Sequence, residues 1–282
     1  MNILSIQSAV AYGHVGNSAA VFPLQRLGHE VWPVNTVNFS NHTGYGEWAG
    51  PALPAVDVSA VIRGIAERGE FPRIDAVLSG YQGGSDIAQV IVQAAREVRA
   101  ANPKALYVCD PVMGNAKSGC HVDDAIPPLL RDVVVPEADV ITPNQFELGY
   151  LTGASVGDLD STLDAVEKAR QMGPKTVLVT SVERPDRDEG TIEMLVVDER
   201  GRWLVTTPYL PMKRNGSGDV TVALFAGHYV ATGDASGALA KTASSIFDLL
   251  EKTYRTGNRE LELVAAQDAF AHPREQFAVR EI

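Results

Sequence analysis

The sequence has little cysteine, no surplus of basic charge and no long hydrophobic run, and each shortage excludes a class of protein. Two cysteines, Cys109 and Cys120, are too few for a disulfide framework in 282 residues and are typical of a reducing compartment such as the cytoplasm. The net charge of −11, from 24 basic and 35 acidic side chains, disfavours nucleic acid and anionic membranes as partners. No apolar stretch is long enough to span a bilayer. The opening residues 2–6 indicate a strand rather than a secretory signal.

What is present is a regular alternation of short β-branched runs with longer helical patterns, in a chain that is 45% hydrophobic. The predicted strands include NILSIQ, EVWPVN, DAVLSG, ALYVCD, ADVIT and KTVLVTS. This alternation predicts βαβ units and a mostly parallel sheet with helices on both faces. A hairpin is predicted around residues 198–201, late in the chain. No linker divides the sequence, so we expect residues 1–282 to form one three-layer α/β domain. A TIM barrel is the alternative, although eight evenly spaced strand–helix pairs are not found.

Polar residues follow several of the predicted strands. They are Gln7 and Ser8, residues 110–114, residues 142–147, and Thr180 with Ser181. Ligands of parallel sheets bind outside the carboxyl ends of the strands, so these groups are expected to converge on one rim. Taken singly, Asn144 and Glu147 equally fit the capping box of a helix, and Asp110-Pro111 equally fits a turn.

The segment Gly216-Ser217-Gly218-Asp219 precedes a late apolar helix pattern. A Walker A loop is excluded because the sequence contains no Gly-Lys pair, and a dinucleotide fingerprint fits poorly because residues 216–221 end in Thr and follow a loop. A glycine-rich turn that presents backbone N–H groups at a helix N-terminus would hold an anion such as phosphate. An ordinary helix start with an acid in its first turn fits these four residues equally well.

The combination of GSGD at 216–219, DPVMG at 110–114 and TPNQFEL at 142–148 resembles the ribokinase superfamily. Further segments resemble its pyridoxal kinase branch, bacterial pyridoxamine/pyridoxal kinases above all: IQS at 6–8, YGHVGNSAA at 12–20, NHTGYG at 41–46, LSGY at 78–81 and VAAQD at 264–268. The resemblance implies a ribokinase-like three-layer α/β/α sandwich. It also implies ATP-dependent phosphorylation of the 5′-hydroxymethyl group of pyridoxal, and of pyridoxamine and pyridoxine, by a cytoplasmic homodimer that uses Mg²⁺ and a monovalent cation.

The resemblance also assigns roles on the nucleotide side. Asp219 would accept the proton of the attacking hydroxyl, and the backbone N–H groups of Gly216, Ser217 and Gly218 would stabilise charge on the transferred group. Asp110 and Glu147 match positions near the phosphates and Mg²⁺, where carboxylates act directly or through water. The matched nucleotide contacts are Asp110, Glu147, Thr142, Asn144, Thr180, Met212, Lys213, Arg214 and Asn215.

On the acceptor side, the resemblance implies that Ser8 and Thr43 bond polar edges of the pyridine, Tyr81 packs on its face and Val15 adds an apolar wall. Gly44 also belongs to this side, but many bacterial relatives carry Gln there, and Lys where Thr180 stands. Both departures put substrate preference and efficiency in question, and Lys213 or Arg214 are candidates to supply the missing charge.

Cys120 is a lid candidate, because its Gly-flanked loop follows the DPVMG turn. Its thiolate would add reversibly to the aldehyde of pyridoxal. The alternative is a small residue packed beneath a loop.

Two other functions stay open at this point. One is a kinase for a related ring such as hydroxymethylpyrimidine, against which residues 41–43 and 78–81 argue. The other is a non-catalytic pyridoxal phosphate binding protein. An intact Asp219 favours the enzyme, because a pure binder has no need of a base.

Overall fold

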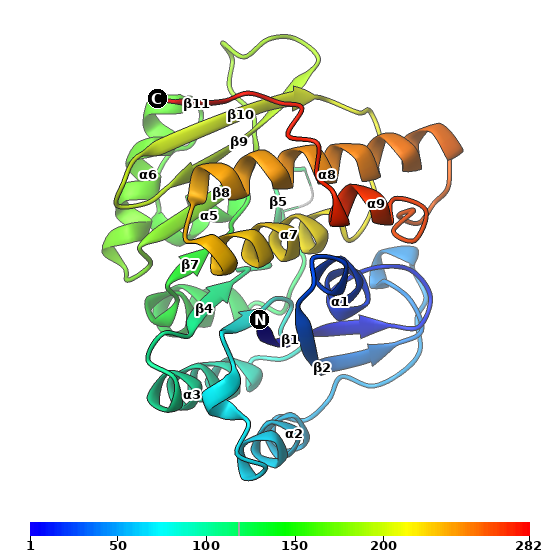
Figure 1. The fold of residues 1–282 in the computed structure, drawn as a ribbon, viewed down its shortest axis with the longest axis vertical. Helices are drawn as coiled ribbons and strands as arrows, with labels where there is room; N and C mark the ends of the chain where they lie inside the picture. Colours follow the sequence, from blue (N-terminus) through cyan, green and yellow to red (C-terminus); the bar gives the residue numbers. More distant parts are fainter. Residues whose placement is uncertain (118) are drawn as a thin grey trace.

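The computed structural model describes residues 1–117 and 119–282, and its centre is a nine-stranded sheet in the order β11-β10-β9-β8-β7-β4-β3-β1-β2 (Figure 1). Neighbouring strands from β2 to β8 are parallel. They are β2 (Glu30–Phe39), β1 (Asn2–Val10), β3 (Ala76–Ser79), β4 (Leu106–Cys109), β7 (Val140–Ile141) and β8 (Thr176–Val182). The sheet continues with antiparallel pairing through β9 (Thr191–Val197), β10 (Arg202–Pro208) and β11 (Val279–Glu281).

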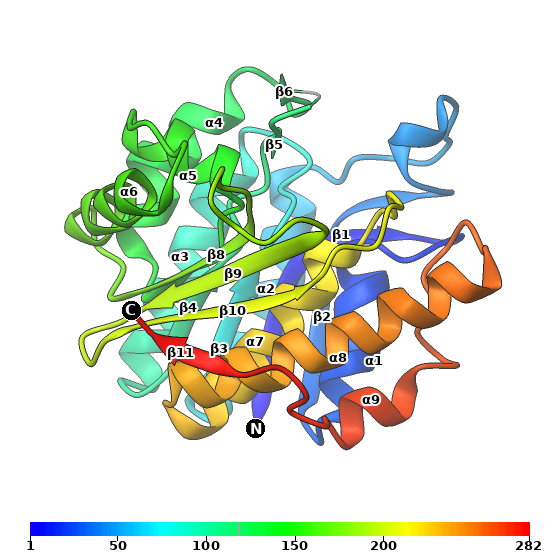
Figure 2. The same ribbon diagram turned by 90° about the horizontal axis from the view of Figure 1, so that it is seen from above.

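Helices cover both faces of this sheet (Figure 2). One layer contains α1 (Asn17–Arg26), α7 (Ser217–Thr232), α8 (Ala235–Thr256) and α9 (Gln267–Ala271). The other contains α2 (Ala55–Glu67), α3 (Ile87–Ala101), α4 (Ile126–Leu129), α5 (Gln145–Thr152) and α6 (Leu159–Gln171). The predicted three-layer α/β/α sandwich with a mostly parallel sheet is confirmed. The sheet is open, with β2 and β11 at its edges, so the TIM barrel alternative is wrong.

Two hydrophobic cores form because the sheet is buried on both sides. In β1, Leu4 and Ile6 belong to the core on the α3 side, whereas Ile3 belongs to the core on the α7 side. In β4, Tyr107 belongs to the core on the α3 side and Val108 to the core on the α7 side. Burial of both faces explains why these strands are nearly continuous apolar runs in the sequence. Within the described part of the chain, no helix has the length and apolarity that a membrane crossing needs.

Some elements differ from the predictions. The Pro-rich helical segment near residue 130 divides into α4, the π-helical turn Leu130–Val134 and the 3-10 turn Val135–Glu137. The prolines at 127 and 128 lie in the first turn of α4, where proline is tolerated. The small hairpin of β5 (Gly114–Asn115) and β6 (Gly119–Cys120) and the strand β11 were not predicted. The carboxyl ends of the parallel strands β1, β3, β4 and β7 lie at the same end of the sheet, and the loop that follows β1 meets the start of α7 there.

Candidate active site

The site is built around the N-terminus of α7. Gly216 is the N-cap residue with φ of 84°, and no side chain caps the helix. A Cβ atom at Gly216 would lie 1.7 Å from the carbonyl oxygen of His14, so this position needs glycine. The N–H groups of Ser217 and Gly218, at the first two positions of the helix, have no acceptor within the helix and suit an acceptor from outside it.

Burial raises the pKa of Asp219, in this first turn, to about 6. The backbone N–H of Gly16 lies near its carboxylate and, with the residue's own N–H, lowers this pKa in part. Gly16 in turn lies tightly against Ser8, because a Cβ atom at Gly16 would stand 2.2 Å from the Ser8 carbonyl oxygen. The end of β1, the loop before α1 and the start of α7 therefore meet at Asp219. Its carboxyl group is ionised at neutral pH and is able to accept a proton.

A second carboxylate, Asp110, is 7% exposed at the end of β4. It accepts a hydrogen bond of 3.3 Å from the hydroxyl of Thr142. Burial raises the pKa of Asp110 well above its usual range, and the neighbouring carboxylates of Glu147 and Asp219 raise it further. The charged groups acting on Asp110 within the described residues are all acidic, an arrangement that suits a cation.

Glu147 is buried at the start of α5 and binds mainly backbone. Its carboxylate accepts N–H groups of Met113 (2.9 Å), Gly114 (3.2 Å) and Asn144 (2.9 Å). Asn144 completes the capping box by accepting the N–H of Glu147 at 3.0 Å, and its amide also donates to the Gly114 carbonyl at 2.8 Å. Burial raises the pKa of Glu147 to about 7. The capping box is confirmed, and it also fixes the segment after Asp110 to α5.

A divalent cation fits this arrangement, but Asp110 and Glu147 are suited to bind it in different ways. Asp110 accepts one long hydrogen bond and lies among acidic neighbours, so it is suited to direct ligation. Glu147 already accepts three N–H bonds and is suited to contact through water. No group of three or more potential metal-binding side chains is found among residues 1–117 and 119–282.

A cavity of about 1100 Å³ opens beside the start of α7. The predicted nucleotide-side residues that line it are Asn144, Thr180, Met212, Lys213, Arg214, Ser217 and Gly218. Asp110, Thr142, Glu147 and Asn215 are not among its lining residues. Much of the apolar wall was missed by sequence reasoning and includes Phe146, Tyr150, Tyr209, Phe247 and Leu250. These residues come from α5, α8 and the segment after β10, and their spacing is also typical of an ordinary core.

The predicted acceptor-side residues lie outside the lining of this cavity. Ser8 and Val15 are buried, and Tyr81 is half-buried after β3, where burial and Asp123 raise its pKa. Thr43 is exposed at the start of the 3-10 turn Thr43–Tyr45. The contact of Ser8 with Gly16 connects this side to Asp219, and Ser217 and Gly218 connect Asp219 to the cavity.

Comparisons with known proteins identify the family of this chain. A model of the phosphomethylpyrimidine kinase family matches residues 54–263. The chain is 66% identical to pyridoxal kinase PdxY of Corynebacterium diphtheriae and 68% identical to that of Leifsonia xyli, with full coverage of both partners in each comparison. The chain belongs to the pyridoxal kinase family. A solved structure, that of Leishmania donovani pyridoxal kinase in complex with ADP and ginkgotoxin, superposes with a TM-score of 0.93 at 30% identity, covering 100% of this chain and 99% of that one.

The contact of Gly44 with His42 explains why a glycine fits at position 44 of this pyridoxal kinase family member. A Cβ atom at Gly44 would lie 2.8 Å from Nδ1 of His42, and this nitrogen accepts the Gly44 N–H at 2.9 Å. A larger residue at position 44 therefore requires the imidazole to move. The glycine and the His42 orientation belong together in this chain.

Lys213 and Arg214, which line the same cavity as Thr180, differ in their contacts. Arg214 donates to the carbonyl oxygens of Asn258 at 2.7 Å and Lys213 at 2.9 Å, so its guanidinium holds the loop. Burial is the largest cause that lowers the pKa of His42 and of His121; His121 and then Lys213 lower that of His42 further, and Lys213 lowers that of His121. Lys213 is thus the better candidate to supply the charge that Thr180 lacks.

Cys120 is exposed in β6, and the neighbouring Ser118 lies outside the described residues. Partial burial raises the pKa of the Cys120 thiol, and the carboxylates of Glu147 and Asp124 raise it further. This environment works against a thiolate at neutral pH.

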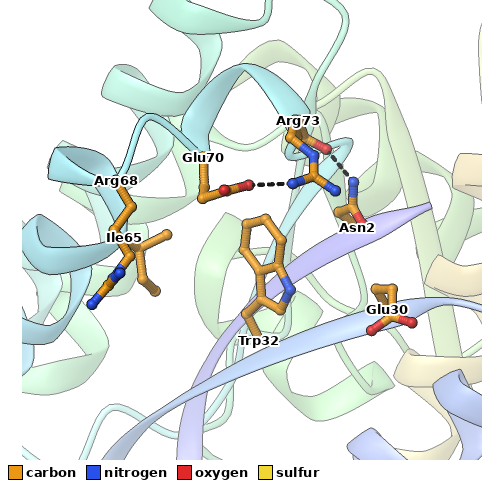
Figure 3. A pocket seen from close by; sticks show the side chains of 7 residues that line it. All are labelled: Asn2, Glu30, Trp32, Ile65, Arg68, Glu70 and Arg73. Carbon is orange, nitrogen blue, oxygen red and sulfur yellow. Dashed lines mark hydrogen bonds and ion pairs between the residues drawn. The ribbon is translucent and has the colours of Figure 1, made fainter.

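A second cavity, of about 540 Å³, lies at the opposite end of the strands, where β1 and β2 begin (Figure 3). Trp32 and an ion pair of 2.7 Å between Arg73 and Glu70 form part of its wall. Because it contains none of the residues that meet at α7, it is not part of the candidate active site.

Proposed function

We propose that this chain is a pyridoxal kinase that transfers the γ-phosphoryl group of ATP to the 5′-hydroxymethyl group of pyridoxal, and also of pyridoxamine and pyridoxine. The proposal is supported by the names of the full-length relatives and by the similar structures, whose bound molecules include ADP with pyridoxamine or pyridoxine. The observation that carries it is the place of Asp219. Its neighbours Ser217 and Gly218 line the large cavity, and Gly16, which packs against Ser8, acts on its carboxylate.

In the proposed reaction the hydroxyl oxygen of the vitamer attacks the γ-phosphorus while Asp219 accepts its proton. The bond between the γ-phosphorus and the β,γ-bridging oxygen breaks, and ADP leaves. A pKa of about 6 keeps Asp219 ionised at neutral pH yet basic enough to assist. The N–H groups of Gly216, Ser217 and Gly218 are proposed to stabilise the oxygens of the transferred group, since the helix terminus favours an anion.

We propose that Asp110 holds Mg²⁺ directly and Glu147 through water. When bound, the ion would supply positive charge to the phosphates of ATP. Thr142 would hold Asp110 in place through its hydroxyl, and Asn144 would hold the backbone at Gly114. The wall of the large cavity is proposed to take the nucleotide, with Thr180, Met212, Lys213 and Arg214 among its contacts and Asn215 beside them.

For the acceptor, we propose that Ser8 and Thr43 bond polar edges of the pyridine, that Tyr81 packs on its face and that Val15 forms an apolar wall. Gly44 would border the same space. Cys120 is proposed to act as part of a lid, because β6 pairs with β5 directly after the segment that Glu147 fixes.

Several coarser features complete the proposal. One domain over residues 1–282 is supported by the sheet, which contains both the first and the last strands of the chain. A cytoplasmic location is supported by the two free cysteines. A homodimer and a monovalent cation are supported by the family resemblance of the sequence.

The test is an assay of the purified protein with ATP, Mg²⁺ and each vitamer in turn, with hydroxymethylpyrimidine as a competing acceptor. The name of the matching family model makes that second ring a specific rival. We expect phosphorylated pyridoxal as the main product. A faster reaction with hydroxymethylpyrimidine would overturn the proposed substrate, and no transfer to any acceptor would favour a binding protein.

A further inference from the structure

Three consecutive residues after α8, namely Asn258, Arg259 and Glu260, contact three different loops of the candidate active site. We call residues 258–260 the strap. It begins after Gly257, which ends α8 in the left-handed conformation with φ of 67°. It is followed by Leu261, which is 2% exposed and fixes this end of the strap in the core beside α7.

The first contact ties the strap to the loop before α7. Arg214 donates from Nε to the carbonyl oxygen of Asn258 at 2.7 Å. The side chain of Asn258 donates to the carboxylate of Glu262, which holds the strap from its other end. The loop that leads into Gly216 is thus fixed to the end of α8.

The second contact ties the strap to the acceptor side. The guanidinium carbon of Arg259 lies 3.6 Å from the centre of the Tyr45 ring, a cation–π arrangement. Tyr45 also lies 6.3 Å from the ring of Tyr12, centre to centre. Because Tyr45 ends the 3-10 turn that begins at Thr43, the contact restrains the segment proposed to bind the vitamer.

The third contact reaches the loop that touches the base. The carboxylate of Glu260 accepts the backbone N–H of His14 at 3.1 Å. A Cβ atom at Gly13 would lie 2.5 Å from a carboxylate oxygen of Glu260, so the two are tightly packed. Two residues further on, the N–H of Gly16 lies near the Asp219 carboxylate, and the carbonyl of His14 itself packs against Gly216. Glu260 therefore fixes the loop that orients the Asp219 carboxylate.

We infer that Arg259 and Glu260 are positioning residues for the phosphoryl transfer, with separate effects. Arg259 holds the 43–45 turn and sets the affinity for the acceptor. Glu260 holds the 13–16 loop and sets the rate at which Asp219 assists the attack. Neither side chain is among those that line the large cavity, so neither is expected to affect nucleotide binding. This inference rests on the proposed kinase function.

The test of Arg259 compares Arg259→Ala with Arg259→Lys. We expect Arg259→Ala to raise KM for pyridoxal about two- to fivefold, the worth of an exposed cation–π pair, with kcat and KM for ATP unchanged. Arg259→Lys keeps a cation over the ring and should recover most of this loss. Tyr45→Leu should raise KM by a similar factor, and the double variant should add little to it. An equal KM in Arg259→Ala and wild type would overturn the role of Arg259.

The test of Glu260 compares Glu260→Ala with Glu260→Gln. We expect Glu260→Ala to lower kcat about tenfold with KM for ATP unchanged, because a small displacement of the base is costly. Glu260→Gln retains an oxygen that accepts the His14 N–H and should recover most of the rate. A purely structural role would lower the unfolding temperature without this separation of kcat from KM, and that result would overturn the inference.

Arg255→Ala is the matched control, because Arg255 lies in the last turn of α8, just before the strap, but pairs with Glu251 on the surface. It should leave all kinetic constants unchanged. Wild-type protein that phosphorylates no vitamer would contradict the proposed function, whereas active wild type with an unaffected Glu260→Ala variant contradicts the strap alone. If hydroxymethylpyrimidine is the true acceptor, the same variants are measured with it.

Discussion

The backbone of Gly216 lies against the carbonyl oxygen of His14, so closely that a Cβ atom at Gly216 would stand 1.7 Å from it. The two residues are about two hundred positions apart in the chain. Their contact brings the loop before α1 against the start of α7. The same approach brings the Gly16 N–H near the Asp219 carboxylate, where it lowers the pKa of that group.

Replacing Gly216 by Ala should therefore lower both stability and activity. The new Cβ atom must push the His14 carbonyl away, and φ of 84° is strained for alanine. We expect a lower unfolding temperature and a kcat reduced on the order of a hundredfold, as for a displaced catalytic group. Gly218→Ala is the matched control for stability, because a Cβ atom there would meet nothing within 4 Å. Equal unfolding temperatures for the two variants would contradict this account.

Asp219→Asn should nearly abolish transfer and leave pyridoxal binding largely intact. Loss of a general base costs on the order of a hundredfold or more in rate. In the wild type, kcat should fall as the pH drops through about 6, because protonation of Asp219 removes the base. The measurements are kcat between pH 5 and 8 and a pyridoxal titration of both proteins. If Asp219→Asn kept most of its turnover, the assignment of Asp219 as the general base would be wrong.

Asp110→Asn should stabilise the protein at neutral pH when Mg²⁺ and ATP are absent. The folded pKa of Asp110 is raised, so its favourable contribution is present below the unfolded pKa and is lost as the pH rises through the folded value. Asn cannot ionise, so the variant avoids the loss of stability that ionised Asp110 causes. At pH 8 we expect a higher unfolding temperature, by about 2–4 °C for each kcal/mol of stability gained, and little difference near pH 4.

The control for this prediction is Asp132→Asn, because Asp132 is exposed and its bond to Arg131 lowers its pKa. This variant should gain no stability at pH 8. Asp110→Asn should at the same time weaken binding of Mg²⁺ with ATP. A loss of stability at pH 8 in Asp110→Asn would mean that another group already compensates the buried charge.

The sequence predicted local features of the site well. The capping box of Asn144 and Glu147 depends on residues three positions apart, and it forms as predicted. The bonds that Glu147 accepts from the N–H groups of Met113 and Gly114 were not predicted, because these residues lie more than thirty positions away in the sequence. Strand order brings these segments together, and no local pattern encodes it.

The wall of the large cavity was missed for a different reason. Phe247 and Leu250 are spaced as on any buried helix face, so their pattern does not separate a ligand cavity from a core. The strand β11 spans only Val279–Glu281 and shows no alternation long enough to predict it. Its pairing with β10 became visible only in the folded chain.

The last prediction concerns Cys120 and the aldehyde of pyridoxal. The raised pKa of this thiol keeps it protonated at neutral pH, so rapid formation of a hemithioacetal is disfavoured there. We expect Cys120→Ala to change the release of pyridoxal and of pyridoxine, which has no aldehyde, by the same factor at pH 7, as a lid without covalent chemistry would. Dissociation rates of both vitamers from wild type and variant measure this, with Cys120→Ser as the variant closest in size. A loss confined to pyridoxal, absent with pyridoxine, would show instead that the thiol reacts with the bound aldehyde despite its carboxylate neighbours.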